Sequence, residues 1–443
     1  MALLLAAALL LTVAAGPRAA LGAARRVGAL PVGAISVRIA DAPPGARIPQ
    51  GFLGFSLETP ALHSPAIVSP SSALVALMRA LGPGQLRISG VSVDRTQWMG
   101  VPETAAAWQL ATIAPSDLRS LATLMSDTGW KLLLGINLGH PATAAVVEEG
   151  RAASALLGSS LAGVALGNEP DLFTRAPSAP FRAQLGSGAL RPIGWGLESY
   201  EGEISALRAA LGAAGVAVPL YGPDTASSAW LEDYAADQGA GLAALAQHFY
   251  PLDRCFHGRL LRSGPSFGSL LSARIERREA LDLAAFVRIA QGHGLPPRVD
   301  EANSVACAGQ VRTSSAFASA LWAIDFSLIA AREGIVGVNF HGGLGSCRLG
   351  GTITSPWYSP LCTLPDGQLR ARPEYYALLL LRSLEGGSFV PITYATGRRI
   401  VVYALRAPDG SLRVVIDDME LARLAHSRGR ARLPTPVWVA LRA

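Results

Sequence analysis

One stretch of the chain, residues 163–170 (GVALGNEP), constrains the fold more than any other. Its first residues are apolar without alternation, which predicts a parallel strand buried on both faces, and Pro170 ends that strand because proline donates no ladder hydrogen bond. Asn168 and Glu169 therefore lie at the carboxyl end of a buried strand, where barrels of parallel strands carry their chemistry. Loss of solvation there raises the pKa of a carboxyl group, as a general acid requires. A carboxylate that caps a loop is an equally good interpretation of these residues alone.

Strand and helix patterns alternate along most of the chain. Eight short, mainly apolar runs predict strands: residues 51–58, 86–90, 131–138, 163–169, 218–224, 245–250, 299–301 and 336–341. Helical patterns lie between most of them, which predicts an α/β fold, a closed (β/α)8 TIM barrel. We assign residues 49–386 to this barrel.

A second predicted strand also ends in a carboxylate, Glu301, within residues 297–304 (PRVDEANS). It lies far downstream of Glu169, so the two carboxyl groups meet only if the strands share one barrel edge. Two such acids on one edge are the minimum that hydrolysis of a glycosidic bond requires. The pair therefore favours a glycoside hydrolase.

Both ends of the chain predict a second unit made of strands. Residues 34–40 alternate apolar and polar side chains, and residues 387–394, 399–406 and 411–417 are short strand patterns, with a hairpin turn at residues 408–410 (PDG). We expect an accessory β-sandwich domain formed by residues 25–48 and 387–443 beside the barrel.

The N-terminus and the cysteines indicate an oxidising compartment. Residues 2–15 are almost all Leu, Ala and Val, and small residues follow, which predicts a secretory signal over residues 1–24. No Arg or Lys precedes the apolar segment, so an uncleaved membrane anchor is the alternative. An even number of cysteines suits a secreted or extracytoplasmic protein, in which neighbouring loops favour two disulfides among three possible pairings: Cys347–Cys362 and Cys255–Cys307.

Composition excludes several other classes of protein. The formal charge is +6, with Lys131 as the one lysine, and no basic cluster is interleaved with aromatic residues, so we expect no nucleic-acid partner. No apolar stretch beyond the N-terminus reaches membrane-spanning length, so we expect no stable membrane insertion once the signal is removed. No metal-ligand motif is present, so we expect neither a metal nor another cofactor. The mild positive charge would suit an acidic glycan.

Several motifs together resemble glycoside hydrolase family 79, the β-glucuronidase and heparanase group. The resemblance spans about residues 52–418; its motifs are GFSLE (54–58), LRISG (86–90), LGNEP (166–170), HFYP (248–251), DEANS (300–304), ALWAID (320–325) and VNFHGG (338–343). It implies a retaining mechanism with Glu169 as acid/base and Glu301 as nucleophile. It also implies a β-domain built from both chain ends. The activity that it implies is cleavage of β-linked uronic acid.

The chemistry assigns further roles near these two glutamates. Tyr250 is expected to donate a hydrogen bond that keeps Glu301 ionised, with a core tyrosine as the alternative. Asn168 is expected to donate to the sugar 2-hydroxyl, a bond that strengthens in the transition state. Other expected substrate contacts, with capping or structural roles as alternatives, are Glu58, Asp94 and His341.

Three departures from the family pattern bear on the substrate. The second-strand motif continues as SGVS (89–92) instead of a Gly-Gly-Asn-like sequence, residues 305–313 lack the expected tyrosine, and the tail after Met419 is short and arginine-rich. We expect a uronate carboxylate to meet backbone N–H groups of the Glu301 loop, the hydroxyls of Ser304 and Thr313, and the side chains of Gln310 and Arg312. Arg312 is expected to replace the tyrosine with a bidentate contact, and a solvated loop arginine is the alternative. A retaining β-glycosidase for neutral glucosides or xylosides is the competing interpretation.

Two other functions fit the sequence less well. Residues 264–268 (GPSFG) match the nucleophile elbow of serine esterases, but the preceding residues are a poor buried strand. A sugar-binding barrel without catalysis is the non-enzymatic alternative, and the presence of both glutamates argues against it.

Overall fold

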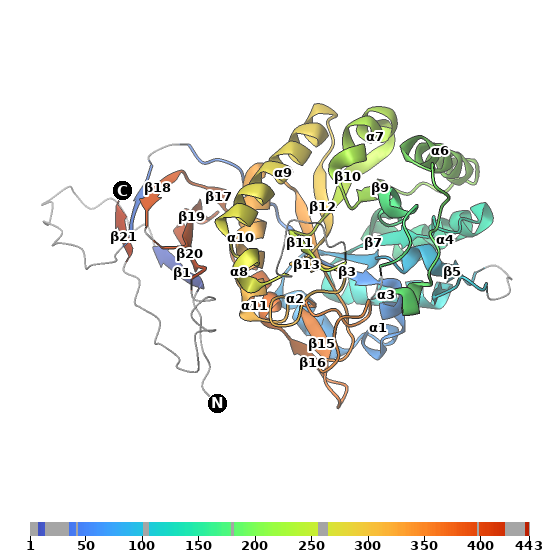
Figure 1. Ribbon diagram of the computed structural model, residues 1–443, viewed down its shortest axis with the longest axis horizontal. Helices are drawn as coiled ribbons and strands as arrows, with labels where there is room; N and C mark the ends of the chain where they lie inside the picture. The colour runs from blue at the N-terminus through green and yellow to red at the C-terminus, as the bar shows by residue number, and fades with distance from the viewer. Residues whose placement is uncertain are drawn as a thin grey trace, which may run out of the picture.

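A closed barrel of eight parallel strands forms the centre of the molecule (Figure 1). The computed structural model describes residues 8–13, 35–40, 43–100, 106–178, 181–255, 265–396, 398–420 and 439–442. Around the barrel the strands are β3 (Leu53–Glu58), β4 (Gln85–Ser89), β7 (Lys131–Ile136), β8 (Leu161–Leu166), β9 (Leu220–Thr225), β10 (Leu242–Phe249), β12 (Pro297–Ala302) and β14 (Gly337–Gly342), and β14 pairs with β3 to close it. The predicted TIM barrel is confirmed.

Helices follow the strands and pack around them. The longer ones are α2 (Ser72–Ala80), α3 (Pro115–Thr128), α4 (Thr143–Leu157), α6 (Leu197–Ala213), α7 (Leu231–Gln238), α9 (Ala273–Gly292), α10 (Phe317–Glu333) and α11 (Pro373–Arg382). Single turns are α1 (Pro65–Val68), α5 (Arg182–Leu185) and α8 (Phe267–Leu270). Their ends follow local sequence: the Ser272 side chain accepts the Ile275 N–H at the start of α9, and Gly334 ends α10 in the left-handed region with φ 110°.

Two sheets form the accessory domain beside the barrel. One pairs β1 (Ala8–Val13), β20 (Leu412–Asp418), β19 (Ile400–Arg406) and β17 (Ser388–Phe389); the other pairs β18 (Ile392–Ala395), β2 (Ile35–Ile39) and β21 (Val439–Arg442). Apolar side chains from both sheets form one small core. The predicted β-sandwich built from both chain ends is therefore confirmed.

Alternation along β19 explains how this domain attaches to the barrel. Ile400, Val402 and Ala404 belong to the core between the two sheets. Val401, Tyr403 and Leu405 point the other way and join the large core of the barrel. Helix α10 lies between the barrel and this sheet, which explains why it is apolar on all sides (Figure 1).

The predicted secretory signal overlaps this domain. Ala8–Val13 forms β1 and pairs antiparallel with β20, while the other residues of the predicted signal lie outside the described ranges. Removal of this segment therefore stays a prediction. Among the described residues, no helix combines the length and apolar character that crossing a bilayer requires.

Both predicted disulfides are present in loops near the carboxyl ends of the strands. Cys255–Cys307 joins the segment after β10 to the segment after β12, where β11 (Leu252–Asp253) and β13 (Val305–Ala306) also pair. Cys347–Cys362 ties the loop after β14 to β15 (Leu361–Thr363), which pairs with β16 (Leu369–Ala371). Two further short strands, β5 (Thr96–Trp98) and β6 (Ala111–Ile113), pair in the loop after β4. These segments build the surroundings of the site.

Candidate active site

A cavity of about 540 Å³ opens at the carboxyl ends of the barrel strands. Its volume lies within the range of about 300–1,000 Å³ that is usual for small-molecule sites. Both predicted catalytic glutamates line it, together with most of the predicted substrate contacts: Glu58, Asp94, Asn168, Glu169, Tyr250, Glu301 and His341. These residues come from six different strands or the turns after them, so the closed barrel brings them together.

Glu301, near the end of β12, is held by donors on both carboxylate oxygens. The Tyr250 hydroxyl donates to its Oε1 at 2.7 Å, and the Arg87 Nη1 donates to its Oε2 at 2.8 Å. His341 Nδ1 lies 3.6 Å from the same Oε2. The position of Tyr250 agrees with the role expected from the sequence.

Glu169 follows β8 in a strained backbone conformation. Its φ of 52° lies in the left-handed region, and its N–H donates to the Asp224 carbonyl at 2.9 Å. Non-glycine residues pay for this conformation, and such strain concentrates at functional sites. The Glu169 Oε1 lies 3.0 Å from His248 Nδ1, which places the carboxyl group beside the cavity.

The environments of the two glutamates push their pKa values in opposite directions. Burial raises the pKa of Glu169, and the nearby Glu301 adds to that rise, although the His248 hydrogen bond opposes it. Burial would also raise the pKa of Glu301, but His341, His248 and Arg87 outweigh it and lower that pKa to about 2. One carboxyl group is therefore suited to carry a proton while the other stays ionised.

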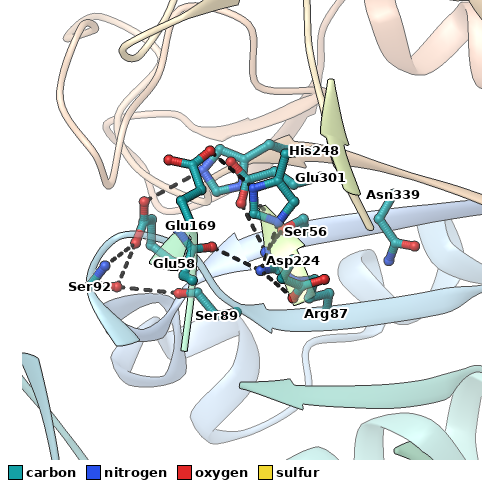
Figure 2. A network of polar contacts seen from close by, with 12 residues as sticks. Ser56, Glu58, Arg87, Ser89, Ser92, Glu169, Asp224, His248, Glu301 and Asn339 are labelled. Carbon is teal, nitrogen blue, oxygen red and sulfur yellow. Dashed lines mark hydrogen bonds and ion pairs between the residues drawn. The ribbon is translucent and has the colours of Figure 1, made fainter. Parts of the chain in front are cut away.

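Arg87 is the cation beneath this pair, and its role was missed in the sequence (Figure 2). It is fully buried on β4, where it forms ion pairs with Asp224 at 3.0 Å and Glu301 at 2.8 Å. Its Nη2 also donates to Asn168 Oδ1 and lies 3.2 Å from His248 Nε2. Because arginine only donates, His248 Nε2 accepts here and Nδ1 carries the proton that is donated to Glu169. A charged residue inside the buried LRIS strand was the available signal, since burial of an unpaired charge is costly.

Asn168 and Asp94 have distinct positions at the cavity. Asp94 accepts three backbone N–H groups, from Leu138, Gly139 and Asn168, at 2.9–3.0 Å. Burial raises the pKa of Asp94 to about 7, although these three bonds oppose the rise. The Asp94 carboxyl thus acts as a cap, which was the alternative interpretation. Asn168 Nδ2 is buried without a partner among the described residues, so a donor is free at the predicted 2-hydroxyl site.

Glu58 and His341 lie on the other side of Arg87. Glu58 Oε2 accepts the Ser92 N–H at 2.9 Å and the Ser92 hydroxyl at 2.5 Å (Figure 2). His341 lies between Glu58 and Glu301, 3.6 Å from each. Burial lowers the pKa of His341, but the two carboxylates raise it above the ordinary value. His341 therefore contributes positive charge next to Glu301.

Gln310 and Arg312 do not reach the cavity. The loop after β13 turns sharply, because Cys307, Ala308 and Gly309 all have left-handed backbone conformations. Arg312 follows with an exposed side chain, and neither it nor Gln310 lines the cavity. The expectation that these two side chains meet a uronate carboxylate is therefore not supported by their placement.

Glu169, His248 and Glu301 also form the one group, within the described part of the chain, that is close enough to hold a metal ion. Each offers one ligand atom, and these atoms lie within 4.8 Å of one another. However, both ring nitrogens of His248 and both oxygens of Glu301 already have partners. The Arg87 guanidinium, 2.8 Å from Glu301, would repel a second cation, so the arrangement suits acid–base chemistry better.

The esterase motif has a local structural role. The Ser266 hydroxyl accepts the Ser269 N–H and caps the short helix α8. Ser266 does not line the cavity that contains the two glutamates. A capping serine explains this motif.

Solved structures with the same barrel provide the comparison. No family model matches the sequence, and no curated protein is significantly similar to it. A 4-O-α-L-rhamnosyl-β-D-glucuronidase from Fusarium oxysporum 12S is 18% identical, with a TM-score of 0.64 over 87% of this chain and 81% of its own. A family 51 α-L-arabinofuranosidase from Bifidobacterium longum is 13% identical, with a TM-score of 0.61 over 87% and 86% of the two chains. The family 51 arabinofuranosidase from Xanthomonas axonopodis pv. citri is also 13% identical, with a TM-score of 0.58 over 87% and 85%. The chain therefore shares the fold of these TIM-barrel enzymes.

Proposed function

We propose that the protein is a retaining glycoside hydrolase in which Glu169 is the acid/base and Glu301 the nucleophile. One observation carries this proposal: the two carboxyl groups share a cavity while their pKa values are shifted in opposite directions. Double displacement requires that difference, because the first step needs one protonated and one ionised carboxyl group.

The separation of the carboxyl groups supports retention of configuration. One oxygen of Glu169 lies within 4.8 Å of one oxygen of Glu301. Retaining enzymes hold their carboxyl groups about 5–5.5 Å apart, whereas inverting enzymes leave about 6.5–9.5 Å for a water molecule. Direct attack by Glu301 fits this spacing better than attack by water between the two groups.

In the first step, a carboxylate oxygen of Glu301 attacks the anomeric carbon while Glu169 gives its proton to the departing glycosidic oxygen. The C–O bond breaks, and a glycosyl ester of Glu301 forms. Tyr250 and Arg87 hold the attacking carboxylate in place, and the free Nδ2 of Asn168 is placed to donate to the 2-hydroxyl.

In the second step, Glu169 removes a proton from water, and the resulting oxygen attacks the anomeric carbon. The ester bond breaks, Glu301 leaves as a carboxylate, and Glu169 is protonated again. His248 orients the Glu169 carboxyl through its Nδ1 during both steps.

The substrate class that we propose is a β-linked uronic acid, most simply glucuronic acid. Its carboxylate must meet donors when it is buried. Ala308 lines the cavity near Glu301, and the N–H groups of Ala308 and Gly309 have no acceptor among the described residues. Backbone N–H groups of this loop were expected from the sequence, and we retain them as proposed carboxylate donors. The Tyr358 hydroxyl takes the place of Gln310 and Arg312, because Tyr358 lines the cavity and they do not. The resemblance to family 79 and the fold shared with a β-glucuronidase agree with this choice.

The test compares kcat/KM on 4-nitrophenyl β-glucuronide, β-glucoside and β-xyloside. The proposal expects the glucuronide to be preferred at least about 10²-fold, since rejection of a substrate that leaves polar groups unpaired is strong. Preference for either neutral sugar would refute the uronate assignment and leave the two glutamates in their roles. If the protein hydrolysed no β-glycoside at all, oligosaccharides included, the proposed glycoside hydrolase activity would be refuted.

We further propose that the protein acts on carbohydrate outside the cytoplasm. Two disulfides, Cys255–Cys307 and Cys347–Cys362, support an oxidising compartment. Mass spectrometry of the protein recovered from the extracytoplasmic fraction tests this: no free thiol and a chain lacking residues 1–24 are expected.

A further inference from the structure

Arg95 is a buried arginine whose charge has no partner among the described residues. It ends the short 3-10 turn η2 (Val93–Arg95) after β4, is only 9% exposed, and lines the cavity that contains Glu169 and Glu301. No hydrogen bond or ion pair from its guanidinium is formed within the part of the chain that the structure describes. An arginine in this position loses solvation, and burial lowers its pKa although Asp94 opposes the change. A charge held in this way favours an anion in the adjacent space.

The neighbouring carboxylates are already occupied. Asp94 Oδ1 accepts two backbone N–H groups and its Oδ2 accepts a third, so both oxygens bind the segments that follow β7 and β8. Asp171, which also lines the cavity, accepts from the Ala226 and Ser227 backbone and from the Ser227 hydroxyl. Neither acid forms an ion pair with Arg95 within the described part of the chain.

The position of Arg95 separates it from the proposed uronate donors. Asp94 bonds to Leu138 and Gly139 after β7 and to Asn168 after β8, which fixes Arg95 over that part of the barrel. In the strand order, β7 lies opposite β12, from which Glu301 and the Ala308 loop extend. Arg95 thus lies on the Glu169 side of the cavity. The leaving group lies on this side, because Glu169 gives it a proton.

A second arginine lies on the same side. Arg175 follows the short turn η4 (Pro170–Leu172) after Glu169, and its exposed side chain lines the same cavity. Arg175 extends positive charge from the buried Arg95 towards solvent. Two aromatic residues of this region, Phe173 and Trp230, also line the cavity.

We propose that Arg95 binds an anionic substituent, a carboxylate or a sulfate, on the leaving group of the substrate. The inference rests on the proposed glycosidase function and extends it: the preferred bond has an acidic group on its leaving side. A guanidinium is well matched to either anion, because its planar donors bind two oxygens together.

The test uses two leaving groups on one glycone. The 4-nitrophenyl and 3-carboxy-4-nitrophenyl β-glycosides of the sugar that the enzyme hydrolyses best differ only by a carboxylate on the leaving group. The ratio of their kcat/KM values is measured for the wild type and for Arg95→Ala, Arg95→Lys and Arg312→Ala, and the folded state of each is checked by circular dichroism. Differences in chemical reactivity cancel when the ratio of a variant is divided by that of the wild type.

Arg95→Ala is expected to lower the ratio about 10- to 100-fold, the usual effect of losing one charge-assisted hydrogen-bonded pair. Arg95→Lys, which keeps the charge without the planar donors, is expected to lie between Arg95→Ala and the wild type. Arg312→Ala is the matched control, because its exposed side chain does not line the cavity, and it should leave the ratio unchanged.

Two results would overturn the inference while the proposed function stands. One is an unchanged ratio in folded Arg95→Ala and Arg95→Lys. The other is a loss in Arg95→Ala that depends on the glycone: kcat/KM on plain 4-nitrophenyl glucuronide falls more than kcat/KM on the matched glucoside. That result would show that Arg95 binds the glycone. Failure of the wild type to hydrolyse any glycoside would remove the proposed function and this inference together.

Discussion

Buried carboxyl groups in two regions of this molecule have pKa values that are shifted in opposite directions. At the carboxyl ends of the barrel strands, Glu301 lies against Arg87, and its pKa falls to about 2. At the junction with the accessory domain, Asp325 on α10 accepts the Tyr403 hydroxyl at 2.6 Å, and its pKa rises to about 7 through burial and the nearby Glu276. Asp417 on β20 is fully buried, neither of its oxygens has a partner among the described residues, and burial with Asp325 nearby raises its pKa.

The difference shows that burial alone does not decide the charge of an acid; the cations around it do, and for Glu301 these are His341, His248 and Arg87. Arg87 is buried with Glu301, and its charge is compensated by ion pairs with the Asp224 and Glu301 carboxylates. Arg399, the arginine beside the junction, forms its ion pair with Glu276 instead, at 2.6 Å. Burial therefore raises the pKa values of the junction acids and favours their protonated forms, whereas Glu301 stays ionised for reaction.

The largest expected effect separates the two groups by activity. Glu301→Gln and Glu169→Gln should each lower kcat/KM at least about 10³-fold, because each removes a reacting carboxyl group. Asp325→Asn, the matched change at the junction, should alter kcat/KM by no more than a few-fold. Kinetics on the best aryl glycoside, with circular dichroism as a check on folding, measure this. Near-normal activity in either glutamine variant would contradict the assignment.

The next effect concerns the cation. Arg87 lowers the pKa of Glu301 together with His341 and His248, so Arg87→Met removes part of that effect and should shift the acid limb of the kcat/KM profile to higher pH. We also expect roughly 10²-fold lower activity at neutral pH and, since a buried partner charge is left unpaired, a loss of about 3–5 kcal/mol in stability. Arg399→Met is the control, and it should leave the acid limb in place. Identical pH profiles for Arg87→Met and the wild type would show that Arg87 does not set the charge of Glu301.

A third effect is the pH dependence of stability at the junction. Because Asp325 binds its proton more tightly in the folded chain than in the unfolded chain, its contribution is present below about pH 4 and is lost as the pH rises through about 7. Asparagine at this position cannot ionise, so Asp325→Asn should lose less stability than the wild type over that interval, by on the order of 2–4 kcal/mol. Denaturant unfolding at pH 4, 5.5 and 7 measures the difference. Parallel stability curves would mean that Asp325 does not titrate in this interval.

The smallest effect compares the two disulfides. Cys307 lines the cavity, so replacing Cys255 and Cys307 by Ser should lower kcat/KM roughly tenfold through misplacement of the loop beside Glu301. Cys347 and Cys362 close the loop that carries Tyr358, but neither cysteine lines the cavity, so replacing them should cost about 2–4 kcal/mol of stability and lower kcat/KM less than the first pair does. Equal losses of activity in the two double variants would remove the distinction.

The barrel and the two glutamates were predictable because their signal is local. Continuous apolar runs that end in polar residues indicate buried parallel strands, and closure of the barrel then brings Glu169, Tyr250 and Glu301 to one edge. The alternation in residues 399–406 likewise predicted a strand of the accessory domain.

The features that could not be predicted depend on backbone conformation and on contacts between distant segments, which residue types do not specify. The loop after β13 turns at Cys307 and Ala308, and nothing in those side chains signals a left-handed backbone, so Arg312 was expected in the cavity although it is exposed. The contact between Tyr403 and Asp325 joins segments far apart in the chain. Arg95 gave no signal at all, because its importance comes from the absence of a partner among the described residues around it.

The central claim is that Glu301 forms the glycosyl ester, and trapping that ester tests it most directly. Incubation with a 2-deoxy-2-fluoro β-glycoside that carries a good leaving group, followed by peptic digestion and mass spectrometry, should find one labelled peptide with the sugar on Glu301. The β-anomer should be the first product of normal turnover by NMR. A label on another residue, or the α-anomer as first product, would contradict the proposed mechanism.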